Sequence, residues 1–400
     1  MGKKIVIGAG LTGLVASYYN QDAIVYESSD RIGGRIFSIN DNNNIDMGAQ
    51  FFSEYDRNIM DFIDSLNLSH QLKEFQLKNF SAINREKNFE RHLTDFSDEE
   101  KIELKKFKDI TEIIEEFEND ELISSYFKDW YNRQVGSEAD WFIDALIRMI
   151  TFSDSTKISA IYGIAVINSF FETCFSFSNG LSEIISTIHN IRSHNIYAKN
   201  RITNLKIKKR HITSININGK KMDINKNDKI ISTIPAQALE DILENKDDQL
   251  NKTLKEIRYV SCTTAVFNTK KTCFPNTTGS VFLNTKITAA YENKNKFTMN
   301  KLENENGTIV SFIPDYSHNE YQSNNIAKKE LINIYPDLDN NITERNVMHW
   351  KYGLPICSPN LFKNQKIIME YKPKNLEICG DFMGLPSLDA CVETVRKVNV

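Results

Sequence analysis

The chain lacks the cysteine and histidine spacings that a metal site or a disulfide framework needs. Its 400 residues include six cysteines and seven histidines, but the sequence contains no C-x-x-C pair and no H-x-x-x-H run. Structural zinc sites and disulfide scaffolds depend on closely spaced ligands of this kind. We therefore predict that the protein binds no metal and keeps its cysteines reduced.

Long apolar runs and an excess of positive charge are also missing. No apolar run reaches the roughly 18 residues that a membrane-spanning helix requires. The formal net charge is −4, whereas nucleic-acid-binding domains are usually basic. The basic run at 205–210 is best explained as a solvated strand edge, where lysines block unwanted strand pairing. The N-terminus has no signal-peptide pattern, so we expect a cytoplasmic protein with no transmembrane segment and no nucleic-acid partner.

The first 30 residues carry the pattern of a dinucleotide-binding fold. A β-branched run at 3–7 predicts a strand, and LVASYYN at 14–20 predicts a helix. Between them lies GAGLTG at 8–13 (the first loop), whose glycines permit a tight turn and a close approach to a diphosphate at the helix N-terminus. Glu27 ends the next predicted strand, where its carboxylate can accept the hydroxyls of an adenosine ribose. The pattern indicates an adenine dinucleotide but does not separate NAD from FAD.

A second pair of glycines follows the ribose acid almost at once, which an NAD site does not require. Gly33 and Gly34 let another backbone segment approach the cofactor, and Arg35 can supply charge-assisted hydrogen bonds (33–35, the second loop). DMGAQF at 46–51 (the third loop) adds a further small-residue approach. Three such segments indicate a cofactor that extends past the nucleotide, so FAD fits better than a nicotinamide nucleotide.

These segments resemble the FAD-dependent amine oxidase superfamily, which includes monoamine and polyamine oxidases, renalase-like proteins, protoporphyrinogen oxidase and the phytoene desaturases. Later parts of the chain carry the resemblance in the same order. They are FSNGLSEIISTI at 177–188, KIISTIPAQALEDIL at 229–243 and LEICGDFMGLPSLDACVETVRKV at 376–398. The Gly-Gly-Cys segment that attaches flavin covalently in some members is absent, so the resemblance implies noncovalent FAD.

The resemblance also implies an α/β fold with two domains. One is a Rossmann-like FAD-binding domain of the glutathione-reductase type, and the other is an α+β substrate domain that contains a mixed β-sheet and helices. The FAD-binding domain is expected at 1–75, 176–250 and 350–400, and the substrate-binding domain at 76–175 and 251–349. Apolar spacing predicts an amphipathic helix pair at 97–133, and short β-rich segments at 257–315 predict a sheet beside the flavin.

The last segment is expected to close the cofactor site. Asp381, after Gly380, can accept a hydrogen bond from a ribityl hydroxyl or organise the phosphate-binding groups. Ser387 is expected to cap the closing helix. In the family that these segments resemble, the start of this helix faces the pyrimidine end of the flavin, so the resemblance implies contacts by Leu388 and Asp389 there. The complete set of expected FAD contacts is Gly8, Ala9, Gly10, Leu11, Thr12, Gly13, Glu27, Ser28, Gly33, Gly34, Arg35, Gly48, Ala49, Gln50, Phe51, Ile202, Gly380, Asp381 and Leu388.

Candidate catalytic residues are few, because a flavin accepts a hydride by itself and the protein mainly positions a C–H bond at N5. Many amine oxidases hold a lysine near N5 through a water, and Lys286 is the candidate here, with a plain surface position as its alternative. Trp350 begins a segment that resembles the family's Trp-x-x-Ala-x-Pro. It is the second candidate, with simple packing as its alternative.

The sequence thus predicts an FAD-dependent oxidoreductase that moves a hydride from a C–N or C–C bond of a small organic substrate to flavin N5. Oxygen or another electron acceptor would reoxidise the flavin. Two alternatives stay open: a flavin-dependent desaturase or isomerase of an apolar metabolite, and a flavin-binding protein without turnover. Nothing in the sequence indicates an oligomeric state.

Overall fold

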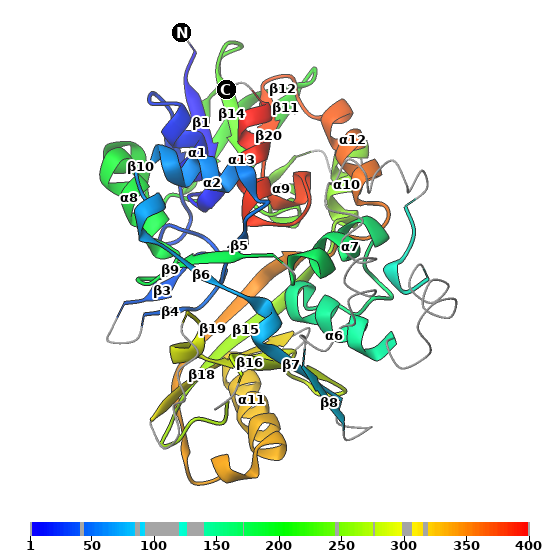
Figure 1. Cartoon of the computed structure of the whole chain (residues 1–400). Coiled ribbons are helices and arrows are strands. Elements are labelled where there is room, and N and C mark those ends of the chain that lie inside the picture. The colour runs from blue at the N-terminus through cyan, green and yellow to red at the C-terminus, as the bar shows by residue number, and fades with distance from the viewer. Residues whose placement is uncertain are drawn as a thin grey trace.

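A computed structural model of the protein shows two parts, one above the other in Figure 1. The residues that it describes are 2–40, 44–84, 89–92, 120–125, 140–170, 172–244, 248–274, 277–297, 306–314 and 319–398. The helix pair predicted at 97–133 lies outside the described residues, apart from 120–125.

A five-stranded parallel sheet forms the centre of the upper part. Its strands run in the order β10-β2-β1-β14-β20, and each neighbouring pair is parallel. The bounds are β1 Lys4–Ile7, β2 Ile24–Tyr26, β10 Ile196–Tyr197, β14 Lys229–Ser232 and β20 Leu376–Ile378. Isoleucine and valine dominate the central strands, as is typical of strands buried on both faces. The carboxyl ends of the strands share one edge, which is where doubly wound folds bind nucleotides.

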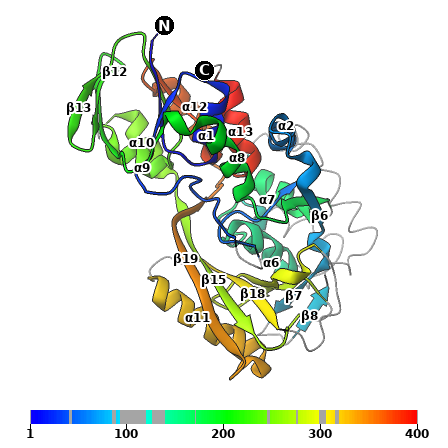
Figure 2. The same ribbon diagram turned by 90° about the vertical axis from the view of Figure 1, so that its left-hand side faces the viewer.

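Two groups of helices surround this sheet. In one group α1 packs against α8 and α13, and α13 also packs against α2. In the other, α9, α10 and α12 lie near an antiparallel sheet of β11, β12 and β13 (Figure 2). The bounds are α1 Leu11–Tyr19, α2 Arg57–Ser65, α8 Ser182–Arg192, α9 Ala236–Ile242, α10 Gln249–Glu256, α12 Leu361–Tyr371, α13 Leu388–Lys397, β11 Ile202–Lys208, β12 His211–Ile217 and β13 Lys220–Asp223.

A seven-stranded mixed sheet forms the centre of the lower part. Its order is β19-β15-β18-β17-β16-β7-β8, in which β16 and β7 are parallel and the other neighbours antiparallel. The bounds are β7 Phe80–Asn84, β8 Phe89–His92, β15 Tyr259–Thr269, β16 Gly279–Leu283, β17 Ala289–Glu292, β18 Gly307–Pro314 and β19 Ile342–Pro355. The predicted α/β fold class, with a parallel sheet in one part and a mixed sheet with helices in the other, is confirmed.

Successive residues of β15 face opposite sides of this sheet, as the period of a strand requires. Cys262 and Val266 join the apolar cluster shared with α6 (Asp140–Thr151) and α7 (Ala160–Ser169). Ala265 and Phe267 join a second cluster with α11 (Glu320–Ile334). Helices therefore cover both faces of the sheet. The apolar cluster on the α6 and α7 face also includes residues of the upper part.

Short strands connect the two parts. They are β3 Ser38–Ile39, β4 Ile45–Asp46, β5 Phe52–Ser53, β6 Leu72–Phe75 and β9 Cys174–Phe177, and β5, β9 and β6 form one antiparallel sheet. Single turns of 3₁₀ helix occur at Ser69–Gln71, Leu77–Asn79, Ser193–Asn195, Asn293–Asn295 (η6), Pro336–Leu338 and Asp381–Met383 (η8). Strands β9 and β19 run across the boundaries expected at 175 and 350. Secondary structure therefore does not mark these two boundaries, and the domain limits stay a prediction.

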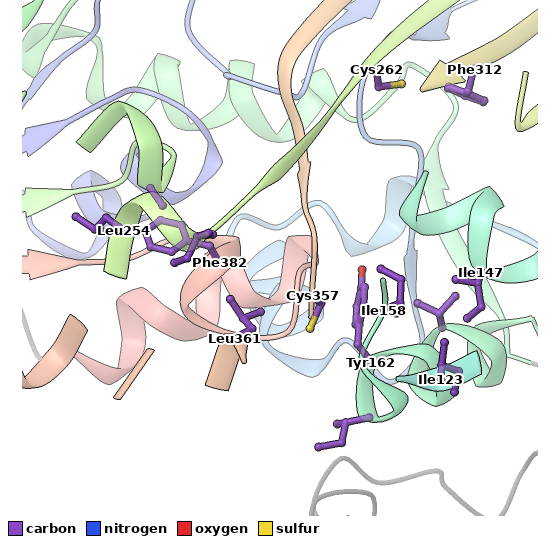
Figure 3. Packing of buried hydrophobic residues seen from close by; sticks show 14 of the residues in the cluster. Ile123, Ile147, Ile158, Tyr162, Leu254, Cys262, Phe312, Cys357, Leu361 and Phe382 are labelled. Carbon is purple, nitrogen blue, oxygen red and sulfur yellow. The ribbon is translucent and has the colours of Figure 1, made fainter. Parts of the chain in front are cut away.

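The largest apolar cluster extends from the parallel sheet to α6 and the mixed sheet. Figure 3 shows Phe382 with Leu254 and Leu361 at one end of the view, and Ile123 with Ile147 at the other. Since one cluster serves both parts, each part contributes to the stability of the other.

Phe62 provides a test of the packing between α2 and its neighbours. The side chain is fully buried, and its ring lies 5.3 Å from Tyr18 and 5.9 Å from Tyr19, centroid to centroid. Phe62→Ala should lower the free energy of unfolding by about 3–5 kcal/mol because it leaves a cavity. Urea unfolding measures this, with the exposed Ile191→Ala as the control. Equal stability of the two variants would contradict the prediction.

Candidate functional site

The first loop joins β1 directly to the N-terminus of α1. Gly8 has φ +97°, a value that favours glycine, and Gly10 is the N-cap of α1. The helix start has no side-chain cap and no acidic residue in its first turn. A Cβ atom at Gly13 would lie 1.9 Å from the Gly8 carbonyl oxygen, so only glycine lets α1 pack this closely on the loop. An uncapped helix start beside bare backbone is a favourable site for a phosphate group.

The second loop lies directly against the first. Gly33 N donates to Ala9 O at 2.7 Å. Gly34 has φ +57°, and a Cβ atom there would lie 3.0 Å from the Gly10 Cα atom. The structure therefore brings together two glycine segments that are more than 20 residues apart, and the absence of side chains permits the contact.

Glu27 lies at the end of β2, beside the first loop. Its Oε2 accepts from Ala9 N at 2.8 Å, and its Oε1 accepts from Ser29 N at 2.8 Å and from the Ser28 hydroxyl at 3.2 Å. The loop before Ile202 reaches the same place, because Asn200 N donates to Glu27 O at 2.7 Å. The Ser29 hydroxyl also donates to Oε1, at 2.9 Å. Each carboxylate oxygen has about two acceptor sites, so Oε1 is filled and Oε2 is the atom with room for a ribose hydroxyl.

Arg35 and Asp381 form a bidentate ion pair between the second loop and η8. Arg35 Nη1 lies 2.6 Å from Asp381 Oδ2, Nη2 lies 3.0 Å from Oδ1, and Nη1 also donates to Gly353 O at 3.1 Å. Burial alone would lower the pKa of the Arg35 guanidinium, but the Asp381 carboxylate outweighs burial and raises that pKa. Gly380, at φ +138°, permits the turn that presents Asp381. Asp381 therefore gives both carboxylate oxygens to Arg35, and its role toward a bound cofactor stays a prediction.

Arg31 also holds the second loop in place, a role that the sequence did not reveal. Its guanidinium donates to three backbone carbonyls, those of Ile32, Gly34 and Ile36, at 2.6–3.1 Å. The same group lies 5.6 Å from the centroid of the Trp350 ring. Burial lowers the pKa of Arg31, while Glu27 and Asp30 act in the opposite direction. The signal in the sequence was the first arginine of DRIGGR at 30–35.

The third loop packs between the second loop and strand β19. Ala49 N donates to Arg35 O at 3.0 Å, and Trp350 Nε1 donates to Met47 O at 2.7 Å. A Cβ atom at Gly48 would lie 1.9 Å from Arg35 O and 3.2 Å from the Trp350 ring. Trp350 is therefore in contact with the loop that is expected to meet the flavin.

Gln50 and Phe51 use their side chains within the protein. The Gln50 amide donates to Asp46 O and Gly48 O at 2.8 Å each, and it accepts from the Tyr291 hydroxyl at 2.7 Å. The Phe51 ring lies 5.4 Å from the Phe75 ring, centroid to centroid. The Gln50 side chain therefore fixes the shape of the third loop.

Helix α13 starts where it was expected. The Ser387 hydroxyl accepts from Ala390 N at 3.0 Å, which confirms the predicted cap. Leu388 is partly buried against the core of the parallel-sheet part. The Asp389 carboxylate accepts from Ile59 N and from the Asn58 amide, each at 2.9 Å, and so satisfies the start of α2. The expected contact of Asp389 with the flavin stays a prediction.

The structure does not support the choice of Lys286 as the candidate lysine. Lys286 lies exposed in the turn between β16 and β17, and no described contact ties it to the glycine loops. Lys296 is the lysine that reaches the third loop, with 7% of its side chain exposed. Its Nζ lies 3.0 Å from Asp46 Oδ2 and 3.0 Å from Gln50 O. The surrounding ENKNKF at 292–297 is strongly polar, so no pattern in the sequence indicates this burial.

Aromatic rings continue from the third loop along the mixed sheet. Tyr291 stacks on Phe312 at 6.2 Å between centroids, with Phe80 and Phe152 beside them at 6.5 and 5.9 Å. Burial raises the pKa of the Tyr291 hydroxyl well above its usual value. These four rings, which we call the aromatic wall, are therefore uncharged at neutral pH.

Comparison with known proteins agrees with this arrangement. Residues 11–351 match the flavin-containing amine oxidoreductases. The chain belongs to that family. A search of curated protein sequences found no match.

Solved structures of several enzymes share the fold of this family member. One, provisionally assigned as a protoporphyrinogen oxidase, from Exiguobacterium sp. 255-15, has a TM-score of 0.75 at 15% identity, over 99% of this chain and 97% of that chain. Cyclohexylamine oxidase from Brevibacterium oxydans IH-35A gives 0.71 at 12% identity, and a fatty acid isomerase from P. acnes gives 0.70 at 12% identity, each over the same shares. Such low identities establish the fold alone.

Because the chain belongs to this family, it is an FAD-dependent enzyme. The uncapped start of α1 and the Gly10–Gly34 contact fit the cofactor, because a Cβ atom at Gly34 would fill the space beside the helix start.

Among the described residues, no cluster of histidine, cysteine or acidic side chains could hold a metal ion. Within the same part of the chain, no helix has the length and apolar character needed to cross a membrane.

The second loop provides a direct test of the cofactor site. Gly34→Val should weaken FAD binding at least about tenfold, because valine is strained at positive φ and would press on Gly10. Arg35→Ala should weaken FAD binding too, since it leaves the Asp381 carboxylate buried without its partner. Titration of the apoprotein with FAD measures affinity, and far-UV circular dichroism checks the fold. Arg57→Ala, at an exposed arginine, is the control. Full affinity in either loop variant would show that its residue has another role.

Asp56, beside Asp389, predicts a pH dependence of stability. Burial raises its pKa to about 6 from 3.8. The folded state then binds the proton more tightly than the unfolded state, so this contribution to stability is present below about pH 4 and is lost as pH rises through about 6. Asp56→Asn should remove this loss of stability, which is about 3 kcal/mol for a pKa shift of this size. Urea unfolding between pH 4 and 7 compares the variant with the wild type. Parallel pH profiles would contradict the prediction.

Proposed function

We propose that this FAD-dependent oxidoreductase oxidises a C–N or C–C bond of a small organic substrate by hydride transfer to flavin N5. The contact between the third loop and the mixed sheet carries the proposal. Trp350 donates to Met47 O from β19, and Tyr291 donates to Gln50 Oε1 from β17. These two contacts bring the aromatic wall next to the loop that would meet the flavin ring.

The bound FAD would supply the hydride-accepting chemistry, and the protein would supply binding, orientation and exclusion of water. The start of α1 would hold the diphosphate, and Glu27 the adenosine ribose. Trp350 and the third loop would fix one side of the flavin ring. Tyr291 and Phe312 would hold the apolar part of a substrate, because their stacked rings lie next to the third loop. We propose oxygen or another electron acceptor for reoxidation. Noncovalent attachment and a cytoplasmic location stay predictions.

A second candidate is a flavin-dependent desaturase or isomerase of an apolar metabolite. The aromatic wall favours it, since the stacked rings of Tyr291 and Phe312 offer dispersion contacts to a hydrocarbon or a ring system. Membership in an enzyme family sets aside the third alternative, a flavin-binding protein without turnover.

Anaerobic bleaching of the bound flavin tests the proposal. The holoenzyme is mixed with amines, amino acids and polycyclic metabolites, and the visible absorption of the flavin is followed. We expect at least one substrate to bleach the flavin, and air to restore the colour if oxygen is the acceptor. Conversion of an apolar substrate without net bleaching would favour the isomerase. If dithionite bleaches the flavin but no substrate in the panel is converted, the proposed activity is wrong.

A further inference from the structure

A buried ion pair joins the mixed sheet to the third loop. Lys296 and Asp46 are 7% and 3% exposed, and their charged atoms lie 3.0 Å apart. Lys296 Nζ also donates to Gln50 O at 3.0 Å and to the Ser176 hydroxyl at 3.2 Å. An ammonium group has three N–H donors, so each has an acceptor within the protein.

Lys296 comes from a turn that is fixed in the mixed sheet. The turn is η6, and the Glu292 carboxylate before it accepts from Thr308 N at 2.9 Å and from Lys294 N at 3.3 Å. Asn295 donates to Phe274 O at 2.9 Å and to Thr277 O at 3.1 Å. The position of Nζ is therefore set by the sheet and not by the loop that it contacts.

The same ammonium group contacts both ends of the third loop. Asp46 is the first residue of the loop, and its carboxylate accepts from Lys296 Nζ. Gln50 lies near the other end, and its backbone carbonyl accepts from the same atom. The second oxygen of Asp46 accepts from the Ser38 hydroxyl at 2.6 Å and from Leu181 N at 2.8 Å. Gly48 and Ala49 lie between the two contacts.

We propose that Lys296 is a positioning residue that sets Gly48 and Ala49 against the flavin from the substrate side. The inference rests on the proposed function, because it assumes that the third loop faces the flavin ring. A buried ion pair adds little stability relative to apolar residues of similar size, but it demands a defined geometry. The loop needs such a constraint, since Gly48 has no side chain to anchor it.

Four variants test this role. Lys296→Met keeps the length of the side chain but removes the charge, and Lys296→Arg keeps the charge. Lys294→Met is the matched control, because Lys294 lies in the same turn and its Nζ donates to Asn306 O at the surface. The double variant Lys296→Met with Asp46→Asn removes both charges together and so avoids leaving a buried carboxylate without a partner.

Three measurements are made on each variant: the Kd of FAD for the apoprotein, the visible spectrum of the bound flavin, and the melting temperature of the apoprotein. We expect Lys296→Met to weaken FAD binding about tenfold, equivalent to about 1.4 kcal/mol, and to shift the flavin spectrum. Lys296→Arg should recover most of the affinity and the spectrum. Lys294→Met should match the wild type, and the double variant should melt near the wild type yet bind FAD weakly.

Wild-type FAD affinity and spectrum in Lys296→Met would overturn the inference. If that variant does not fold, the double variant decides, and wild-type binding in it would likewise overturn the inference. These readouts do not involve substrate turnover. Failure of every substrate to bleach the wild-type flavin would therefore count against the proposed activity, and not against the role of Lys296.

Discussion

The contact between the Gly10 and Gly34 backbones determines where the rest of the site can lie. A Cβ atom at Gly34 would come within 3.0 Å of the Gly10 Cα atom, and Gly34 has φ +57°, so the second loop can run this close to the start of α1 only with glycine at position 34. Arg31 then fixes the second loop through three carbonyls, and Arg35 ties it to Asp381. Each later contact builds on that close approach.

The third loop extends the same arrangement toward the mixed sheet. Its inner side rests on Arg35 O, and its outer side is held by Trp350, Tyr291 and Lys296. These last three side chains come from β19, β17 and the turn after β17, all in the lower part of the molecule. The mixed sheet therefore does more than enclose a substrate, because it also sets the shape of a loop in the cofactor site.

Four acidic side chains each hold a different segment of the upper part in place. Glu27 orders the turn after β2, Asp381 pairs with Arg35, and Asp46 pairs with Lys296. Asp389 accepts from the start of α2. Asp381, Asp46 and Asp389 bind partners that are far away in the sequence. Glu27 accepts a hydrogen bond from Ala9 N in the first loop. This is how a cofactor site assembled from separate segments keeps its geometry.

The parts of the candidate site that depend on local conformation can be predicted from the sequence. The first loop, the acid at Glu27, the glycine pair and the Ser387 cap all rely on backbone geometry and short spacings, which a sequence displays directly. The two-part α/β fold followed from the order of those motifs and from their family resemblance. The burial of Lys296, the exposure of Lys286 and the contact of Asp389 with α2 could not be predicted and became evident from the fold. Burial of a charged side chain depends on a partner brought close by the fold, and Asp46 lies 250 residues before Lys296.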